Sequence, residues 1–248
     1  MTTATTEAAR AFKGTDTLGR SEAELKQLVR HAGAELELAP AEVIIEWAVA
    51  TFGPRFAITS SMGDAVLAHV AAQVAPGVDV VFLDTGYHFA ETIGTRDWIT
   101  SALPITLVNV TPPQTVAEQD LSFGARLHDR DPDLCCDMRK VKPLAQALAG
   151  YVAWGSGVRR DESPTRADTL LVDWDAKRGM LKVNPMASWT QDVVDAYIAE
   201  HQVPVNPLFE LGYGSIGCEP CTRPVAPGED PRAGRWAGRG KTECGIHT

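Results

Sequence analysis

The five cysteines of the chain fall into two close pairs and one isolated residue. Cys135 and Cys136 are adjacent, Cys218 and Cys221 have the CxxC spacing, and Cys244 stands alone near the end of the sequence. A CxxC spacing lets two thiolates reach the same metal site. Four paired cysteines and one separate thiol therefore indicate a four-thiolate metal site and a distinct working thiol.

The spacing of the pairs also bears on the kind of metal site. Zinc prefers four tetrahedral thiolates, and the irons of an iron–sulfur cluster are likewise held by thiolates. The adjacent Cys135 and Cys136 reach a single small ion awkwardly, whereas neighbouring irons of a cubane cluster would give them separate targets. We therefore favour an iron–sulfur cluster over zinc. A redox-active dithiol at the CxxC pair is the second alternative.

Two cations, Arg139 and Lys140, each follow one of the adjacent cysteines by four residues. If the segment is helical, residues four apart lie on one face, so each thiol has a cationic neighbour. Such neighbours favour the thiolate, which is the form that binds metal. Pro143 is expected to kink or restart this helix. The alternative is a pair of buried thiols near a helix start.

The isolated Cys244 lies in a basic tail. It is followed by Gly245 and His247, and a lone thiol in such surroundings is typical of an activated thiolate. The alternative is an exposed terminal cysteine without a function. The basic residues that precede it are Arg232, Arg235, Arg239 and Lys241.

The composition, 44% hydrophobic and 22% charged over 248 residues, suits one large globular domain or one domain with a tail. We expect a flexible lead-in over residues 1–20, an α/β nucleotide-binding domain over 21–211 and a C-terminal segment over 212–248. The N-terminus is polar without an apolar core, which predicts no secretory signal. The most apolar helical run, residues 39–52, contains two glutamates and is too short for a membrane span. We therefore expect a cytoplasmic protein with no membrane partner.

The net charge of −9 argues against a non-specific nucleic-acid binder, so we expect no nucleic-acid partner. An anionic ligand would need a local cluster of cations that works against the overall charge. Cysteines in a reducing compartment do not suggest structural disulfides.

Segments of strand character alternate with helical segments along the chain, which indicates a mostly parallel, doubly wound α/β sheet. The expected strands are residues 55–60, 79–84, 105–110 and 151–155, and the expected helices are 21–32, 40–51, 64–73, 89–101, one that ends at 150, and 191–200.

In a doubly wound sheet, ligands bind at the carboxyl ends of the strands. The first strand-to-helix turn carries hydroxyl groups and free N–H groups that suit an anion. It lacks the glycine spacing and the lysine of a Walker loop, and the alternative is an ordinary tight turn. Its candidate binding residues are Ser60, Ser61, Gly63 and Asp64.

Two further strand ends carry candidate ligand contacts. One has Leu83, Asp84 and Thr85, which suit polar contacts, while the nearby His88 is more often a capping residue than a catalyst. The other is a loop of three arginines, and guanidinium groups match the oxygens of phosphate or sulfate. The alternative for that loop is a solvated charged surface. Its candidate residues are Gly157, Arg159, Arg160 and Arg166.

Taken together, these features resemble the assimilatory phosphosulfate reductases, specifically the iron–sulfur adenosine 5′-phosphosulfate (adenylyl-sulfate) reductases. The paired cysteines and the tail around Cys244 are the most specific part of the match, which runs over residues 56–247. The matching segments are Asp84-Thr85-Gly86-Tyr87, Cys135-Cys136-Asp137-Met138-Arg139-Lys140, Arg159-Arg160 to Arg166, Cys218-Glu219-Pro220-Cys221, Arg232-Ala233-Gly234-Arg235-Trp236 and Lys241-Thr242-Glu243-Cys244-Gly245-Ile246-His247.

The resemblance implies an adenine-nucleotide-hydrolase-like α/β fold and reduction of adenosine 5′-phosphosulfate to sulfite and AMP by thioredoxin. It implies a 4Fe–4S cluster on Cys135, Cys136, Cys218 and Cys221, with Lys140 as its electrostatic link to the substrate. Cys244 would attack the substrate sulfur and carry an S-sulfocysteine intermediate. Near the phosphosulfate the family places Arg232, Arg235 and His247, and around the nucleotide the loop 157–166. The Ser60–Asp64 turn is shorter than the usual family pattern.

Three other functions compete with this interpretation. Family members that use the 3′-phosphorylated nucleotide lack the two cysteine pairs, which favours the simpler substrate. An ATP pyrophosphatase or tRNA-thiolating enzyme would share the fold, but the chain lacks their SGGxDS loop. A zinc-stabilised binding module would leave Cys244 and the arginine loop without a role. The oligomeric state stays open.

Overall fold

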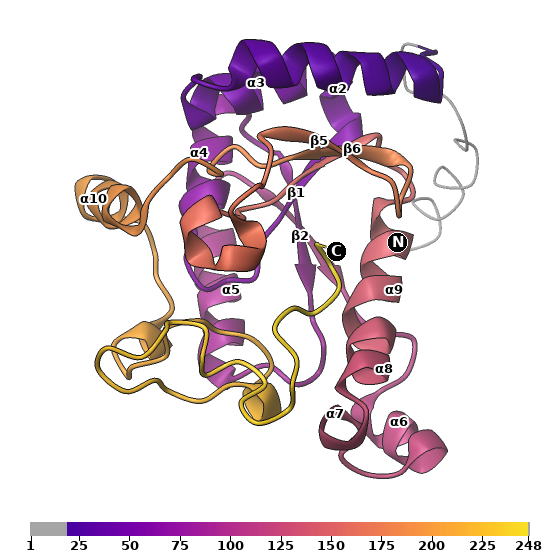
Figure 1. Cartoon of the computed structure of the whole chain (residues 1–248), viewed down its shortest axis with the longest axis vertical. Coiled ribbons are helices and arrows are strands. Elements are labelled where there is room, and N and C mark those ends of the chain that lie inside the picture. Colours follow the sequence, from indigo (N-terminus) through magenta and orange to yellow (C-terminus); the bar gives the residue numbers. More distant parts are fainter. Residues whose placement is uncertain (1–18, 248) are drawn as a thin grey trace.

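The computed structural model describes residues 19–247. Its centre is a six-stranded sheet in the order β3-β2-β1-β4-β6-β5, in which every pair is parallel except β5 with β6 (Figure 1). The predicted mostly parallel α/β fold is therefore confirmed. The strands are β1 (Phe56–Thr59), β2 (Asp79–Leu83), β3 (Thr106–Val110), β4 (Ala153–Gly155), β5 (Val172–Asp175) and β6 (Met180–Val183).

The two faces of the sheet build two apolar clusters, because side chains alternate along a strand. Ile58 and Val80 belong to the larger cluster, which also contains residues of α2 to α5. Ala57 and Val81 belong to the smaller one, which α9 covers with Leu144. The helices on these faces are α2 (Glu22–Leu36), α3 (Ala41–Phe52), α4 (Val66–Val74), α5 (Ala90–Ala102) and α9 (Lys142–Leu148).

Helix starts follow the predicted signals closely. The side chain of Ser21 accepts from the Glu24 N–H while the Glu24 carboxylate accepts from Ser21, a capping box that begins α2 as expected. The helix continues four residues past the predicted end at Ala32, to Leu36. Helix α10 (Gln191–His201) begins after Thr190, whose side chain accepts from the Val193 N–H.

Several elements were absent from the prediction. These are the antiparallel hairpin of β5 and β6 at one edge of the sheet, and the short helices α6 (Val116–Phe123) and α7 (Leu127–Arg130). Gly179, at a φ of +67°, closes the turn of the hairpin. Its left-handed backbone is one that glycine adopts without steric cost.

The adjacent cysteines lie in an unbroken but irregular helix. Helix α8 (Pro132–Cys136) passes into a π-helical turn, η2 (Asp137–Val141), and then into α9. The Lys142 N–H donates to the Asp137 carbonyl five residues back, which marks the wide turn. Pro143 follows directly, where its missing N–H and bulky ring are accommodated. The predicted interruption is therefore a local widening.

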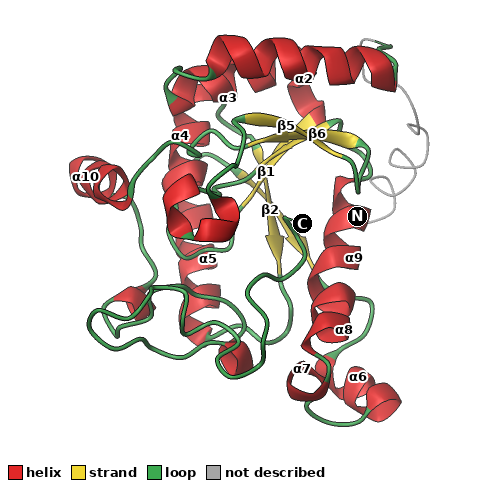
Figure 2. Ribbon diagram, viewed as in Figure 1, coloured by secondary structure: helices red, strands yellow, loops and turns green. Residues whose placement is uncertain are grey.

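The C-terminal segment has little regular structure, as the loops of Figure 2 show. It contains η6 (Glu219–Cys221), and its tail then returns to the sheet, where Ile246 packs against the smaller apolar cluster. The division at residue 212 stays a prediction, and residues 1–18 of the expected lead-in lie outside the described part. Within that part, none of the helices has both the length and the apolarity of a membrane span.

Candidate active site

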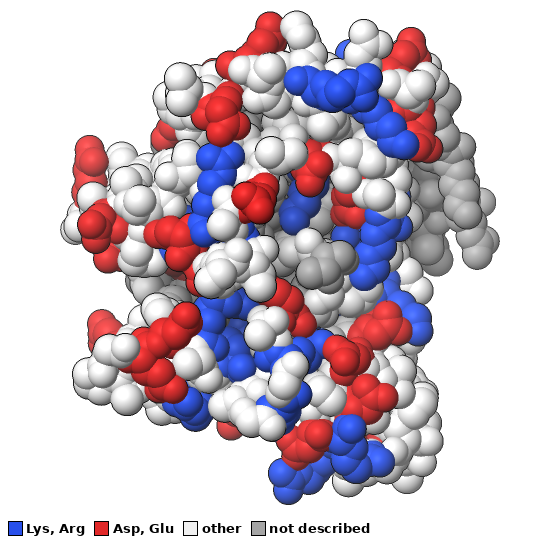
Figure 3. Space-filling view, in the orientation of Figure 1, with Lys and Arg blue, Asp and Glu red and all other residues white. Residues whose placement is uncertain are grey.

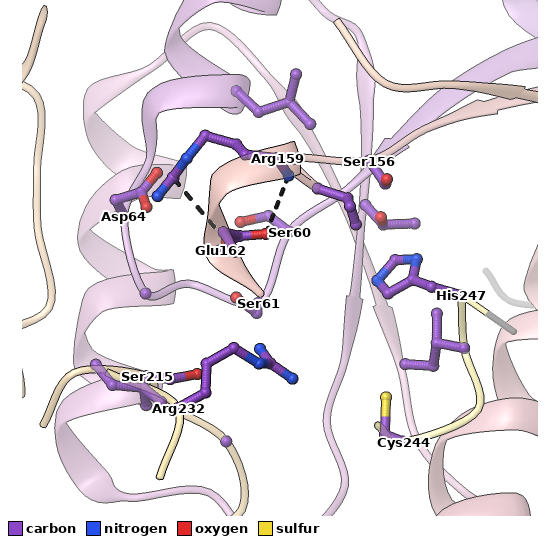
Figure 4. Close-up of a pocket in the computed structure, with 18 of the residues that line it drawn as sticks. Ser60, Ser61, Asp64, Ser156, Arg159, Glu162, Ser215, Arg232, Cys244 and His247 are labelled. Carbon is purple, nitrogen blue, oxygen red and sulfur yellow. Dashed lines mark hydrogen bonds and ion pairs between the residues drawn. The ribbon is translucent and has the colours of Figure 1, made fainter. Parts of the chain in front are cut away.

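A cavity of about 640 Å³ lies at the carboxyl ends of β1, β2 and β4 (Figure 4). Its volume is in the range of small-molecule and cofactor sites. The cavity collects residues that lie far apart in the sequence. The sequence-predicted residues that line it are Ser60, Ser61, Gly63, Asp64, Leu83, Thr85, Lys140, Gly157, Arg159, Arg166, Arg232, Arg235, Cys244 and His247.

Hydrogen bonds from Asn206 hold the Ser60–Asp64 turn in a fixed shape. Met62 is fully buried with a φ of +58°, an unusual conformation for a residue with a side chain. The amide of Asn206 donates to the Met62 carbonyl at 3.2 Å, and the Asn206 N–H donates to the Gly63 carbonyl at 2.8 Å. These bonds leave the exposed Ser61 at the rim of the cavity.

Carboxylates line the cavity near this turn. Asp64 accepts from the Val66 N–H at 3.0 Å, and burial raises its pKa despite that bond. Glu162 accepts from the Arg159 N–H at 3.0 Å. The buried Arg159 guanidinium donates to Gln191 and Asp161. Its side chain is therefore fixed by neighbours at the wall of the cavity.

Two of the sequence-predicted binding residues are absent from the lining. Asp84 follows β2, but its carboxylate pairs with Arg96 at 3.4 Å and accepts from the Gly86 N–H. Arg160 donates to the Thr169 carbonyl at 2.7 Å and to Glu37 at 3.0 Å. Both side chains are committed to structural contacts, so we leave them out of the proposed binding set.

Cations gather on one side of the cavity. Figure 3 shows lysine and arginine atoms around the hollow in the middle of this face, although the chain as a whole is acidic. Arg235 donates to Ser215 and to the Ile216 carbonyl, while its buried Nε has no partner among the described residues. Lys140 is buried at the border of the same cavity. These groups form the local basic cluster that an anionic ligand requires.

The tail carries Cys244 and His247 into the cavity. Both point toward the space that Arg232 faces in Figure 4. The His247 ring stacks on Trp154 with centroids 5.8 Å apart. Burial, together with the nearby Lys182 and other cations, holds the pKa of His247 well below its usual value, so the imidazole is neutral. His247 therefore adds no positive charge beside the thiol.

Lys241, one of the basic residues that precede Cys244, forms an ion pair with Asp133 and not with the thiol. Lys140 is instead the cation whose charge interacts with Cys244. Burial opposes the charge of Lys140, but the thiolates of Cys218 and Cys244 outweigh this and raise its pKa. Lys140 therefore stays charged at neutral pH.

Glu243 and Glu162 are site residues that the sequence reasoning missed. Glu243 accepts two hydrogen bonds from Arg166, at 2.9 and 3.0 Å, directly before Cys244. Burial would raise the pKa of Glu243, but Arg166 and Arg232 outweigh it and lower the pKa. A glutamate two residues after a lysine gives no signal in the sequence, since its partner lies 77 positions away.

The four paired cysteines meet in a second, small cavity beside the first. Cys135 and Cys136 come from α8, and Cys218 and Cys221 flank η6, and all four are buried. Trp236 packs against this group. The small cavity and the large one share Lys140 and Trp236 in their walls.

Burial keeps the thiols of Cys135 and Cys136 protonated despite nearby cations. Burial and the neighbouring thiols raise the pKa of Cys135 to about 12, and burial raises that of Cys136 to about 11. For Cys218, burial is outweighed by Lys140 and by Thr85, whose Oγ lies 3.3 Å from the sulfur, and its pKa is lowered. Arg139 donates to the Thr85 carbonyl and to Gln119, so it serves the surrounding structure.

This donor set fits a thiolate-bound metal group. Four thiols enclosed away from water suit iron or zinc, which thiolates bind with release of their protons. Among residues 19–247, no three cysteine, histidine or acidic side chains converge closely enough for a single metal ion. The four sulfurs line one small cavity, where together they could hold a thiolate-bound metal group.

The fold and the site are those of an α/β enzyme of the nucleotide-binding kind, with its cavity at the carboxyl ends of the strands. Cations lie along one side of the cavity together with one thiol, and a separate group of cysteines lies beside it. The family model of the phosphoadenosine phosphosulfate reductase domain matches residues 55–224. An adenosine 5′-phosphosulfate reductase of Streptomyces coelicolor is 61% identical over 92% of this chain and 97% of its own. One of Mycolicibacterium smegmatis is 53% identical over 94% and 99%.

A solved structure agrees with these sequence matches. The crystal structure of phosphoadenylyl-sulfate reductase from Candida auris, a phosphate complex, superposes with a TM-score of 0.68 and 27% identity, covering 79% of this chain and 96% of that one. The chain belongs to the phosphoadenosine phosphosulfate reductase family, as its sequence resemblance predicted.

Proposed function

We propose that the chain reduces adenosine 5′-phosphosulfate to sulfite and AMP in sulfate assimilation. It is an oxidoreductase that acts on a sulfur group, as its relatives named adenosine 5′-phosphosulfate reductase support. The observation that carries the choice of substrate is the group of four buried cysteines that shares Lys140 with the large cavity. The iron–sulfur members of the family have these cysteine pairs, whereas members that use the 3′-phosphorylated nucleotide lack them.

The reacting sulfur of the substrate is electrophilic, but anionic oxygens surround it and repel a thiolate. Lys140, Arg232 and Arg235 line the cavity and would offset that repulsion. The Cys244 thiolate forms a bond to the sulfur, and the sulfur–oxygen bond to AMP breaks. The electron pair of that bond leaves on the phosphate of AMP, and Cys244 keeps an S-sulfonate.

The neutral His247 has a different part in this scheme. Its ring is fixed against Trp154, and its buried Nδ1 has no partner among residues 19–247. A neutral imidazole can donate one hydrogen bond without adding charge. We propose that His247 orients an oxygen of the phosphosulfate, while the cations supply the charge.

Cys135, Cys136, Cys218 and Cys221 would hold a 4Fe–4S cluster. When bound, the cluster would join α8 to the C-terminal segment and set its charge against Lys140. The chain's own side chains enclose the site of the cluster. Trp236 and Tyr87 exclude water from the four thiols, and Lys140 is held between the two cavities.

Turnover needs a dithiol, for which we propose thioredoxin. A thiolate of thioredoxin attacks the Cys244 sulfur, and the sulfur–sulfur bond breaks to release sulfite with the electron pair. The second thiol of thioredoxin then attacks the mixed disulfide, restores the Cys244 thiolate and leaves oxidised thioredoxin. The two electrons thus come from thioredoxin. A cytoplasmic location suits this reduced partner and the five free thiols.

Sulfite release tests the proposal directly. The purified protein is assayed with thioredoxin and either adenosine 5′-phosphosulfate or its 3′-phosphorylated relative. We expect kcat/KM to be at least about 100-fold higher for the first nucleotide, a difference of about 2.7 kcal/mol. Equal values, or a preference for the second, would contradict the choice of substrate while leaving the family assignment in place.

A further inference from the structure

The tail that carries the nucleophile has no regular secondary structure to hold it. Residues 241–247 contain neither helix nor strand. The position of Cys244 therefore depends on side-chain contacts of its neighbours. Glu243, one residue earlier, makes the most extensive charged contact of this segment in the described part of the chain.

Two arginines from different segments bind the Glu243 carboxylate. Arg166 donates from Nε at 2.9 Å and from Nη2 at 3.0 Å, one to each carboxylate oxygen. Arg232 lies 3.2 Å from the same carboxylate and also donates to the Thr242 carbonyl at 3.1 Å. A bidentate arginine–carboxylate pair fixes direction as well as distance. The contact therefore sets where the next residue lies.

The ion pair is sheltered from solvent. The side chains of Glu243, Arg166 and Arg232 are 14%, 13% and 16% exposed. By contrast, Lys241 pairs with an Asp133 that is 84% exposed, where water and salt weaken the attraction. Of these two ion pairs, the Glu243 contact should therefore contribute more to the docking of the tail.

Arg166 is fully engaged in this docked arrangement. Its remaining nitrogen, Nη1, donates to Glu162 at 2.5 Å, so protein carboxylates occupy Nε, Nη1 and Nη2. Arg235, in contrast, retains a buried Nε without a partner among the described residues. While the tail is docked, Arg166 binds Glu243 of the tail, and Arg235 remains available to an anion in the cavity.

We propose that Glu243 is a positioning residue, whose carboxylate, held by Arg166 and Arg232, keeps the Cys244 thiol inside the cavity. This inference rests on the proposed function for its assignment of Cys244 as the nucleophile. Glu243 itself touches neither substrate nor leaving group in this role. Its ion pairs determine the fraction of molecules in which the Cys244 thiol lies inside the cavity.

The test compares Glu243→Gln with Glu229→Gln in the intact, iron-loaded protein. Glutamine keeps the size of the side chain and removes its charge. Glu229 is the matched control, because it also binds one arginine, Arg223, through two bonds in the C-terminal segment, but is absent from the cavity lining. Glu243→Asp tests whether the charge alone restores part of the docking.

The first measurement needs no activity. Iodoacetamide modifies exposed thiols, and trypsin would release residues 242–248 for mass analysis. We expect Glu243→Gln to speed alkylation of Cys244 by about tenfold, since charge-assisted hydrogen bonds are lost. The alkylation rate of Glu243→Asp should lie between those of Glu243→Gln and the unmodified protein. The rate of Glu229→Gln should match that of the unmodified protein. Unchanged alkylation in Glu243→Gln overturns the proposal.

The second measurement separates positioning from substrate binding. In sulfite release, Glu243→Gln should lower kcat by about tenfold and change KM by less than about threefold. A raised KM with unchanged kcat would show that Glu243 supports nucleotide binding instead, which overturns the proposal. If Glu243→Gln speeds alkylation but even the unmodified protein releases no sulfite, the docking role of Glu243 stands. Only the proposed function is then contradicted.

Discussion

At the scale of single residues, the five cysteines divide by cavity. Cys244 lies in the wall of the large cavity, and the other four line the small one. The Cys244→Ser variant should keep the cluster and bind nucleotide, because serine has nearly the same size. Its hydroxyl is a far weaker nucleophile than a thiolate, so sulfite release should fall by more than about 10³-fold.

An adduct measurement checks this expectation independently of turnover. Incubation of the unmodified protein with adenosine 5′-phosphosulfate, without thioredoxin, should add one SO₃ group to the peptide that contains Cys244. Thioredoxin should then discharge it as sulfite. An adduct on another peptide, or an equal adduct in Cys244→Ser, would show that a different group attacks the substrate.

The neutral state of His247 predicts a pH dependence of tail docking. Its pKa is lowered in the docked tail, so a released tail, with a pKa near 6.5, binds a proton more readily as the pH falls. Docking should therefore lose stability below about pH 6.5 and be independent of this group above it. His247→Asn should remove this dependence.

Alkylation rates measure the effect if each is divided by that of His247→Asn at the same pH, since the ratio cancels the ionisation of the thiol. The ratio of the unmodified protein to the variant should rise as the pH falls from about 7.5 to about 5.5. A flat ratio would mean that His247 is protonated in the docked state as easily as in the released one.

Residue types and spacing were enough to identify the cysteine groups, but not the direction of each side chain. Arg159 is extended, whereas Arg160 begins the 3₁₀ turn η3 (Arg160–Glu162) and donates to Thr169 and Glu37, so only Arg159 lines the cavity. The role of Glu243 was also hidden from the sequence, because it exists only once Arg166 and Arg232 are folded beside it. Pairings over such separations depend on the tertiary structure.

At the scale of elements, the parallel strands were predictable because β1, β2 and β3 are short apolar runs that alternate with helices. The hairpin of β5 and β6 was missed, since Asp173, Asp175 and Lys182 interrupt its apolar pattern at the sheet edge. The π-helical turn at Asp137–Val141 gave no sequence signal beyond Pro143. The wide turn is nevertheless part of the segment that places Lys140 between the two cavities.

The strand-end turn after β1 depends on a side chain from another element. Asn206 is fully buried and donates to Met62 and to Thr92, while its oxygen accepts from the Leu208 N–H. Asn206→Ala should lower the free energy of unfolding by about 2–3 kcal/mol, because buried polar groups lose their partners. KM for the nucleotide should rise as the Ser60–Asp64 turn loosens.

Chemical denaturation and sulfite release would measure these two effects. Asn109→Ala is a suitable control, since Asn109 bonds Arg96 on the exposed side of the sheet and is absent from the cavity lining. It should leave KM unchanged. If Asn206→Ala lost stability but kept the original KM, the turn would hold its shape without Asn206.

At the scale of the whole molecule, the small cavity joins two parts of the chain that are far apart in sequence. The α8 cysteines belong to the α/β domain, whereas Cys218 and Cys221 belong to the segment that returns the tail to the strand ends. A metal group on all four would connect these parts, and ligand binding of this kind contributes directly to folding free energy. Loss of the cluster should therefore release the C-terminal segment before it disrupts the sheet.

The Cys221→Ser variant tests this order of events. Iron and acid-labile sulfide, counted in protein prepared without oxygen, should each be about four per chain in the unmodified protein and absent in the variant. Limited proteolysis should cut the variant first within residues 212–247, while the sheet, with its two apolar clusters, stays protected. Stoichiometric zinc without sulfide in the unmodified protein would contradict the cluster. Cleavage spread evenly over the chain would show instead that the four cysteines stabilise the α/β domain as a whole.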